Sequence, residues 1–209
     1  MIHDTVNTAD GPFSILVGLG IDHRPAVIAS GWTATITDLL ALVHADIIRI
    51  SQAEPASPNK PASTSNPASP HGLVSPDGPA RQNADTGLGQ VMDQARRAVH
   101  SYYSGDFAPA MEVPVSYQAS SYRLQAMKAL HTVGPSTQLT YSQFAALTGR
   151  PAAVRAAASA CSHNPAALFI PCHRIVPTGT GKGGFRYGLD IKNRLLEREA
   201  QALTGLQGQ

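Results

Sequence analysis

Two short apolar runs near the N-terminus are rich in residues that favour β-structure. They are Phe13–Val17 and Ala26–Ala29, and glycines, aspartates and histidines stand around them. Apolar runs between turn-forming residues are typical of strands. The pattern therefore predicts a strand over each run, followed by a short helix over Thr37–His44.

A helical repeat and a further β-favouring run follow later in the N-terminal half. In the segment Gly87–Tyr103 apolar residues recur every three to four positions, at Val91, Ala95, Val99 and Tyr102. This spacing places their side chains on one face of a helix. We expect a helix over Gly87–Tyr103 and a strand over Met111–Val115.

Between these elements, residues 51–86 are rich in Pro, Ser, Ala and Asn and have almost no large apolar side chains. Such a segment buries too little apolar surface to offset the entropy of ordering it. We interpret residues 51–86 as a mobile insertion in an N-terminal domain of residues 1–117. A C-terminal domain then covers residues 118–209.

The C-terminal part reads as a series of helices, of which the first covers Tyr122–Leu130. Thr140 and Gln143 have the spacing of a capping box, which favours the start of a second helix that runs to Leu147. A Gly-Arg-Pro break follows, and the third helix covers Ala152–Ser162. Two short helices joined by a glycine-containing turn indicate a helix-turn-helix.

The third helix has an unusual composition, because six of its ten residues from Ala152 to Cys161 are alanine. Helix propensity alone would explain alanine in an ordinary core helix. It does not explain Arg155, the one charged residue of this smooth surface. A helix with such small side chains could approach a narrow groove closely.

In the last helical segment, Lys192, Leu195, Leu196 and Glu199 lie at offsets 0, 3, 4 and 7 and share one face. Glu199 is thereby predicted to point inward with the leucines. The alternative is an ordinary solvated glutamate, because basic residues stand nearby.

The overall net charge of +2 conceals an asymmetry between the two parts of the chain. Residues 123–199 hold ten Lys or Arg against three acidic residues, whereas the remainder holds six against eleven. A basic half beside a mildly acidic half indicates a face that meets a polyanion such as nucleic acid. A solvated basic surface without a partner is the alternative.

Nothing in the sequence approaches eighteen consecutive apolar residues, and the N-terminus lacks the pattern of a signal peptide. We therefore expect a soluble, cytoplasmic protein without a membrane partner. Two cysteines fit a reducing compartment, and they make neither a four-ligand zinc site nor a disulfide framework.

One of these cysteines, Cys172, follows the apolar run Ala167–Ile170 and directly precedes a histidine and an arginine. An imidazole and a guanidinium beside a thiol favour the thiolate, which is the form that attacks electrophiles. We therefore predict a nucleophilic thiolate on a turn that leaves a buried strand. The alternative is a cysteine that serves as a small buried hydrophobic residue.

The ordered set Tyr141, Arg155, Asn164, Pro171-Cys172-His173-Arg174 and Gly188-Leu189 is highly specific. Over about residues 118–200, without an internal gap, the chain resembles the O6-alkylguanine-DNA alkyltransferases, also called methylated-DNA–protein-cysteine S-methyltransferases. The resemblance implies irreversible, single-turnover transfer of an alkyl group from O6 of guanine to Cys172, with O4 of thymine as a further candidate. It implies no cofactor, no metal, and a monomer that binds the minor groove of double-stranded DNA containing O6-alkylguanine.

The fold that this resemblance implies has two parts. The N-terminal domain is α/β, a ribonuclease-H-like sheet with a helix whose role is mainly scaffolding. The C-terminal domain is mainly helical and contains the helix-turn-helix and the cysteine.

The resemblance also implies the roles of the catalytic residues. Cys172 is the nucleophile, and His173 is its base, acting through a water molecule, with Glu199 orienting the imidazole. Tyr141 supplies a proton toward N3 of guanine, because the base leaves with negative charge. Asn164 ties the helix-turn-helix to the cysteine loop.

For DNA, the resemblance implies that Arg155 enters the base stack in place of the extruded nucleotide and offsets part of the cost of flipping it. The other residues expected to contact DNA are Tyr141, Ser142, Arg150, Ser121 and Arg123. The glycine-rich segment Thr178–Tyr187 is expected to form the wall of the guanine pocket. The pocket residues are Ile175, Phe185, Arg186 and Lys192, with a backbone N–H near Arg186 facing O6.

The chain departs from the family pattern at Phe185, where a tyrosine is usual, and at Met127, which takes the place of a tryptophan. Packing against the base should survive at Phe185, whereas any hydroxyl contact is lost. Met is a flexible core filler, so packing can differ at Met127 without a change of chemistry.

Three other functions compete with alkyl transfer. Alkyltransferase-like proteins only bind alkylated bases and lack the cysteine, which is present here as Cys172. A cysteine hydrolase usually draws its histidine from elsewhere in the chain. A transcriptional regulator would need side chains that read major-groove edges, and the alanine helix offers few of them.

Overall fold

The structure is a computed structural model that describes residues 1–42, 79–117, 119–179 and 183–206. Most of the insertion expected at residues 51–86 lies outside the described residues. Its last eight residues belong instead to helix α3 (Pro79–Tyr103), which begins earlier than the apolar repeat predicts. A helix can start without apolar residues, because Pro is favoured in its first turn and the next turns need only backbone hydrogen bonds.

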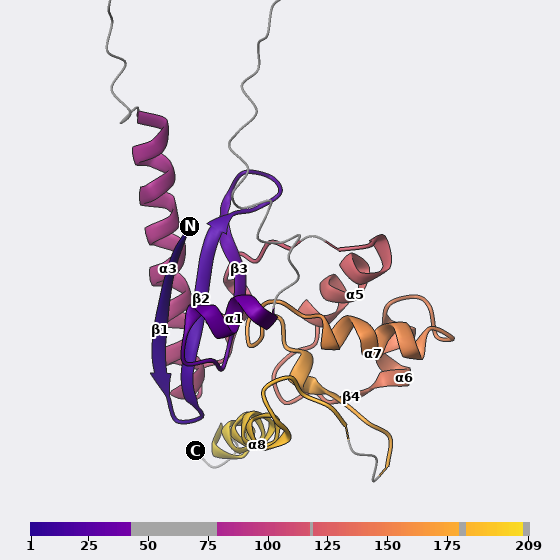
Figure 1. The fold of residues 1–209 in the computed structure, drawn as a ribbon. Helices are drawn as coiled ribbons and strands as arrows, with labels where there is room; N and C mark the ends of the chain where they lie inside the picture. The colour runs from indigo at the N-terminus through magenta and orange to yellow at the C-terminus, as the bar shows by residue number, and fades with distance from the viewer. Residues whose placement is uncertain (43–78, 118, 180–182, 207–209) are drawn as a thin grey trace, which may run out of the picture.

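Three antiparallel strands form the N-terminal sheet in the order β1 (Ile2–Thr8), β2 (Gly11–Leu19) and β3 (Pro25–Gly31) (Figure 1). The strands predicted over Phe13–Val17 and Ala26–Ala29 are confirmed. The sequence reading missed β1, because in this mostly polar strand only Val6 is buried.

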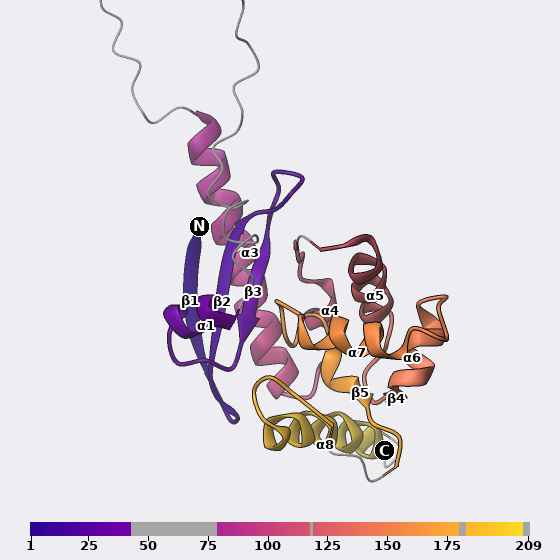
Figure 2. The same ribbon diagram turned by 45° about the vertical axis from the view of Figure 1, so that its right-hand side comes forward.

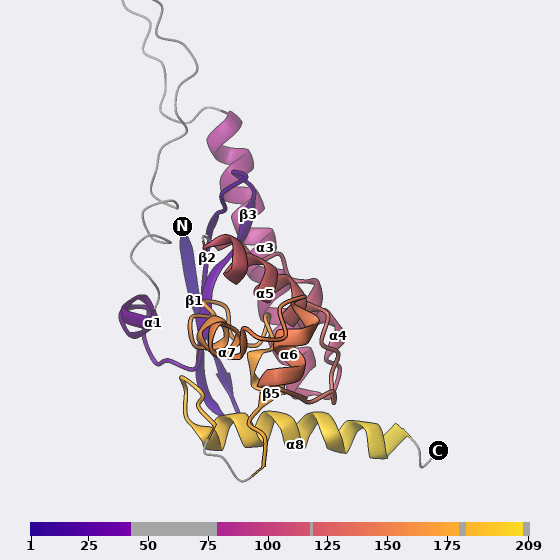
Figure 3. The same ribbon diagram turned by 90° about the vertical axis from the view of Figure 1, so that its right-hand side faces the viewer.

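Both faces of this sheet are covered, which explains the unbroken apolar run in β2. Phe13 and Ile15 belong to the core that includes α3, whereas Leu16 packs with Leu39 of α1 (Ile36–Leu42). Figure 3 shows α3 and α1 on opposite sides of the sheet. The helix expected over Thr37–His44 is thus present in its described part.

The strand predicted over Met111–Val115 is wrong for its first two residues, which end the short helix α4 (Ala108–Glu112). Only the following backbone is extended: Val27 of β3 donates to Pro114 at 2.8 Å and accepts from Ser116 at 2.9 Å. A proline cannot donate to a strand ladder, so the pairing remains a single bridge.

The C-terminal part consists mainly of the helices α5 (Ser121–His131), α6 (Tyr141–Leu147), α7 (Val154–Ser162) and α8 (Leu189–Leu206). The capping box predicted for α6 is present, with Thr140 Oγ1 accepting from Gln143 N at 3.2 Å and Gln143 Oε1 from Thr140 N at 2.8 Å. Among the described residues, no helix has the length and apolar character needed to cross a bilayer.

A two-residue parallel ladder organises the centre of this part. Strand β4 (Leu139–Thr140) pairs with β5 (Ile175–Val176), which directly follows the 3-10 turn η1 (Cys172–Arg174). Because α6 starts immediately after β4, the ladder fixes Tyr141 near the turn that carries the cysteine.

The N-terminal unit (β1 to α4) and the C-terminal unit (α5 to α8) share one core. Phe13 of β2 meets Phe169 edge to face at 6.1 Å between ring centroids. Helix α8 lies across the end of both units (Figure 2). It is braced there by Asp10, which accepts from Arg194 at 2.5 Å and Arg198 at 3.2 Å.

Candidate active site

The apolar run before Cys172 is buried, but it is not the strand that the sequence predicts. Leu168 has a left-handed backbone with φ of 73°, and Ile170 N donates to Ala166 O at 2.9 Å. These two features close a tight turn, so only an isolated bridge joins Ala166 to Ser30 of β3. The turn delivers the chain to η1, where Cys172 lies.

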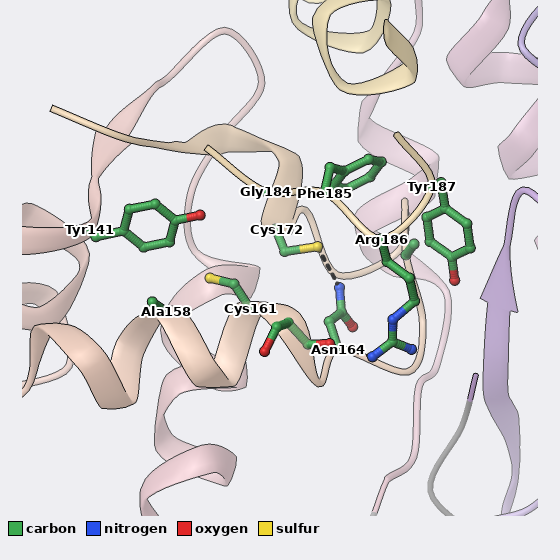
Figure 4. A pocket seen from close by; sticks show the side chains of 11 residues that line it. Tyr141, Ala158, Cys161, Asn164, Cys172, Gly184, Phe185, Arg186 and Tyr187 are labelled. Atoms are coloured by element: carbon green, nitrogen blue, oxygen red, sulfur yellow. Dashed lines mark hydrogen bonds between the residues drawn. The ribbon is translucent and has the colours of Figure 1, made fainter. Parts of the chain in front are cut away.

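Cys172 stands beside a cavity of about 320 Å³ and is 8% exposed. Figure 4 shows its sulfur among the side chains that line this cavity. The volume is in the range of sites that enclose small molecules. The lining residues are Tyr141, Ala158, Cys161, Ser162, Asn164, Ala167, Cys172 and residues 184–187. An electrophile the size of a base can thus meet the sulfur.

Asn164 connects the end of α7 to the cysteine turn. Its Nδ2 donates to Ile170 O at 2.8 Å and to Cys172 Sγ at 3.0 Å, while its Oδ1 accepts from Ala166 N at 3.0 Å. This buried amide does what the resemblance implies, because it joins the helix pair to the cysteine loop.

The prediction of a resting thiolate is wrong. Burial raises the pKa of the Cys172 thiol, although the Asn164 hydrogen bond and the charges of Lys192 and Arg186 act in the opposite direction. The flanking cation does not serve the sulfur, because the Arg174 guanidinium is turned to Glu199. The resting group is therefore a thiol that needs a base.

His173 has the properties of such a base. It is fully buried, and its Nε2 lies 2.9 Å from Glu199 Oε1. Burial lowers the pKa of His173, against the raising effect of Glu199, so the imidazole is neutral. Since the carboxylate can only accept, Nε2 carries the proton and Nδ1 keeps a lone pair. Nδ1 has no partner among the described residues.

Glu199 is buried on α8, as its spacing with the leucines predicts. Burial alone would raise its pKa, but hydrogen bonds from His173 and Arg174 hold the value at about 2. Arg174 donates to Oε1 from NH2 at 2.8 Å, and Ser136 N donates to Oε2 at 3.0 Å. The carboxylate is thus ionised and fixed in orientation.

A further donor to Glu199 comes from the N-terminal unit, and the sequence reading assigned it only to a helix face. Tyr102 of α3 donates from its hydroxyl to Glu199 Oε1 at 2.9 Å, and the hydroxyl oxygen itself lies 3.4 Å from His173 Nε2. Its ring meets the imidazole edge to face. No pattern within α3 could have revealed a partner almost a hundred residues away.

The described part of the predicted wall segment Thr178–Tyr187 also depends on the N-terminal unit. Phe185 and Tyr187 both pack against Trp32, with ring centroids 6.0 and 5.5 Å away. The Tyr187 hydroxyl donates to Ser30 O at 3.1 Å. The N-terminal sheet thus shapes the cavity, beyond the scaffolding role expected of it.

The four residues expected to form the pocket separate into two pairs. Phe185 and Arg186 line the cavity, whereas Ile175 and Lys192 are buried and do not line it. Lys192 Nζ donates to Ile175 O at 2.5 Å, so these two residues bind each other beside the cysteine turn.

The residues expected at DNA lie mostly on the outside of the helices. Arg155, Ser142, Arg150 and Ser121 are exposed, and Arg123 is half-buried. The Arg150 guanidinium stacks over the Tyr122 ring at 5.4 Å. Tyr141 is half-buried and lines the cavity, and burial raises its pKa, so its phenol keeps the proton.

The sequence reading also missed the pocket residues of α7 and its C-terminal end. Cys161 of α7 lines the cavity together with Cys172, and its thiol pKa is raised by burial and by that neighbour. Tyr187, in contrast, ends the segment that was expected to form the wall. The helical offset of three and seven residues from Arg155 to Ala158 and Ser162 could have placed this helix face at a pocket.

Comparisons with known proteins show which proteins the chain is similar to. The family model described as 6-O-methylguanine DNA methyltransferase, DNA binding domain, matches residues 121–201. The regulatory protein Ada of Salmonella typhimurium is 41% identical over 91 residues, which are 44% of this chain and only 26% of that protein. The methylated-DNA–protein-cysteine methyltransferase of Methanosarcina barkeri is 32% identical over 110 residues, 53% of this chain and 69% of the relative.

The fold is similar to solved structures over nearly the whole chain. A crystal structure of Mycobacterium tuberculosis OGT in complex with DNA aligns with a TM-score of 0.59 at 20% identity. The alignment covers 96% of this chain and 93% of that one. The mixture of a sheet with packed helices is therefore shared with that structure, and the similarity extends over both units.

Proposed function

The chain belongs to the methylated-DNA–protein-cysteine methyltransferase family, and we propose that it repairs DNA by transferring an alkyl group from O6 of guanine to Cys172. The observation that carries the proposal is the thiol beside a base-sized cavity, with a neutral buried imidazole next to it in the chain. O4 of thymine is a second candidate substrate atom.

The first step is removal of the thiol proton. Neutral His173 accepts it at Nδ1 through a water molecule, while Nε2 keeps its own proton and donates it as a hydrogen bond to Glu199 Oε1. The buried carboxylate stabilises the imidazolium that forms. Asn164 holds the developing thiolate by its 3.0 Å hydrogen bond to the sulfur.

The second step is a displacement at the alkyl carbon. The sulfur lone pair forms the new S–C bond, the C–O6 bond breaks, and its electron pair stays on the guanine. Tyr141, which keeps its proton at neutral pH, donates toward N3 and lowers the energy of the departing anion. The product is a thioether that water does not cleave, so each molecule acts once, and no metal or cofactor takes part.

Recognition of DNA is assigned to the helix pair α6 and α7, which we interpret as a helix-turn-helix that enters the minor groove as a monomer. Support comes from α7, where exposed Arg155 lies one turn from Ala158 at the cavity. An arginine at this place can fill the stack that a flipped base leaves. We further assign a ribonuclease-H-like arrangement to the sheet and α3, and the cytoplasm as the place of action.

The test is stoichiometric label transfer. Wild-type protein is incubated with duplex DNA that carries O6-methylguanine with a labelled methyl group. We expect one equivalent of label on the wild type and none on Cys172→Ser. Cys161→Ser is the matched control, because this thiol lines the same cavity, and it should retain transfer. Label on Cys172→Ser, or many product equivalents per protein, would contradict the mechanism.

A further inference from the structure

Tyr102 is a fully buried residue of α3, and its hydroxyl ends beside the pair that the proposed mechanism uses as a base. The hydroxyl donates to Glu199 Oε1, the same oxygen that accepts from His173 Nε2. Arg174 NH2 donates to this oxygen as well, at 2.8 Å. Arg174 Nε also donates to it, at 3.1 Å, so four donor groups from three side chains compete for the lone pairs of a single carboxylate oxygen.

We propose that Tyr102 is a positioning residue for alkyl transfer, whose hydroxyl holds Glu199 against His173 and limits how strongly the carboxylate attracts the imidazole proton. The inference rests on the proposed function of this site. It gives the N-terminal unit a direct part in the reaction, although none of the described residues of that unit lines the cavity beside Cys172.

The hydroxyl can only act as a donor here. Burial raises the pKa of Tyr102, and the nearby Glu199 charge raises it further, so the phenol keeps its proton at neutral pH. A donor to a carboxylate withdraws electron density from the oxygen and weakens its bond to other donors. With Tyr102 in place, Glu199 is a weaker partner for the imidazolium than it would otherwise be.

The other charged groups that face His173 also shift its pKa. The charges of Arg174 and of Lys192 on α8 disfavour the imidazolium, and Glu199 favours it. Burial has the largest effect and keeps the ring neutral. Removal of one donor from Glu199 should therefore move His173 toward the protonated state, in which it cannot accept the thiol proton.

The experiment follows the rate of methyl transfer as a function of pH in single turnover, with full-length protein and O6-methylguanine duplex. For Tyr102→Phe we expect the acid limb of the profile to move up by about half a unit to one unit, the effect of one hydrogen bond on a pKa. Tyr103→Phe is the matched control, since its hydroxyl bonds Asp10 and Trp32 instead. Its acid limb should coincide with that of the wild type.

A second variant tests the same hydrogen bond if Tyr102→Phe does not fold. Replacement of Tyr102 by 3-fluorotyrosine makes the phenol a stronger donor and should move the acid limb to lower pH. Profiles that superimpose on the wild type, even with a uniformly slower rate, would reduce Tyr102 to a packing role. If the wild type itself transfers no methyl group, the proposed function fails, and that outcome is distinct from an unshifted limb.

Discussion

At the scale of single residues, the buried pair of Glu199 and His173 governs how the protein responds to acid. Both groups have a folded-state pKa below the ordinary value, Glu199 at about 2. For each, the unfolded chain binds the proton more readily than the folded one. The stability that they contribute is present above the unfolded pKa and is lost as the pH falls.

We expect the free energy of unfolding to decline first below about pH 6.5, as His173 protonates in the unfolded chain, and more steeply below about pH 4.5. Glu199 alone should remove about 2 kcal/mol by pH 3. Urea denaturation from pH 7 to pH 3 measures this decline. In Glu199→Gln, the steep part should disappear although the variant is less stable throughout. An equally steep decline in that variant would assign it to other groups.

Single residues also show where sequence reasoning works. The inward direction of Glu199 follows from its offset to the leucines, because a helix face is a local property. The ionisation of Cys172 does not follow from its neighbours in the chain. Arg174 stands two positions away, yet its guanidinium points to a carboxylate supplied by α8. The direction of a side chain is decided by distant partners that adjacent residues do not specify.

At the scale of elements, α7 combines two surfaces. Ala157 and Ala160 are buried against the core, whereas Arg155 and Ser159 are exposed and Ala158 lines the cavity. Small side chains let the helix pack closely on one face and approach a ligand on the other. The one long side chain on the exposed face is therefore available for the stack.

We expect Arg155→Ala to slow methyl transfer from duplex DNA about tenfold to a hundredfold, the loss of a few kcal/mol of support for base flipping. Reaction with free O6-benzylguanine should change little, because no base has to leave a duplex. Parallel single-turnover rates on both substrates measure the difference. Lys128→Ala, at an exposed position of α5 that is not among the expected DNA contacts, serves as the charge control. Equal losses on both substrates would contradict the stack-filling role.

Elements differ in how well a sequence specifies them. The capping box of α6 and the covered strand β2 are encoded by residues within a few positions of each other. The start of α3 and the helix α4 are not, because neither has the apolar period that marks a buried face. The ladder of β4 and β5 is only two residues long and joins segments over thirty residues apart. It is too short to produce a periodic pattern of apolar residues that would predict it.

At the scale of the whole molecule, the contact between β3 and the pocket wall determines the shape of the cavity. Gly31 lies so close to Tyr187 that a Cβ built on it would be 1.9 Å from the phenol oxygen. Tyr187 packs in turn against Phe185 at 5.6 Å. A side chain at position 31 would therefore have to displace the Tyr187 ring where the two units meet.

Gly31→Ala should displace Tyr187, cost about 1–3 kcal/mol of unfolding free energy, and slow transfer through the disturbed wall. Gly89→Ala is the control, because an added Cβ there meets no atom within 4 Å. In helix α3 this change should be neutral or stabilising by up to about 1 kcal/mol. Thermal unfolding and single-turnover rates measure both variants. If Gly31→Ala had the stability and transfer rate of the wild type, Tyr187 would be able to move aside without weakening the fold or the site.

The interface between the two units is the part of the structure that the sequence predicts least well. Trp32, Tyr102 and Tyr187 come from three distant parts of the chain, and each is an ordinary aromatic residue in its local context. Their roles arise only from the packing of the sheet and α3 against the cysteine turn. The chemistry-bearing residues of the C-terminal unit could be recognised because they are close in sequence.

The hydrogen bond from Tyr102 of α3 to Glu199 matters for any attempt to use the C-terminal unit alone. A fragment that starts at Ala119 would inherit the nucleophile, its base and the carboxylate, but it would leave behind the phenol of Tyr102 and the indole of Trp32. A fusion protein made with such a fragment would contain the reactive thiol but would lack the hydrogen bond from Tyr102 to Glu199 and the packing of Trp32 against the pocket wall. The C-terminal unit can be delimited in the sequence, but the site that it carries also depends on side chains of the N-terminal unit.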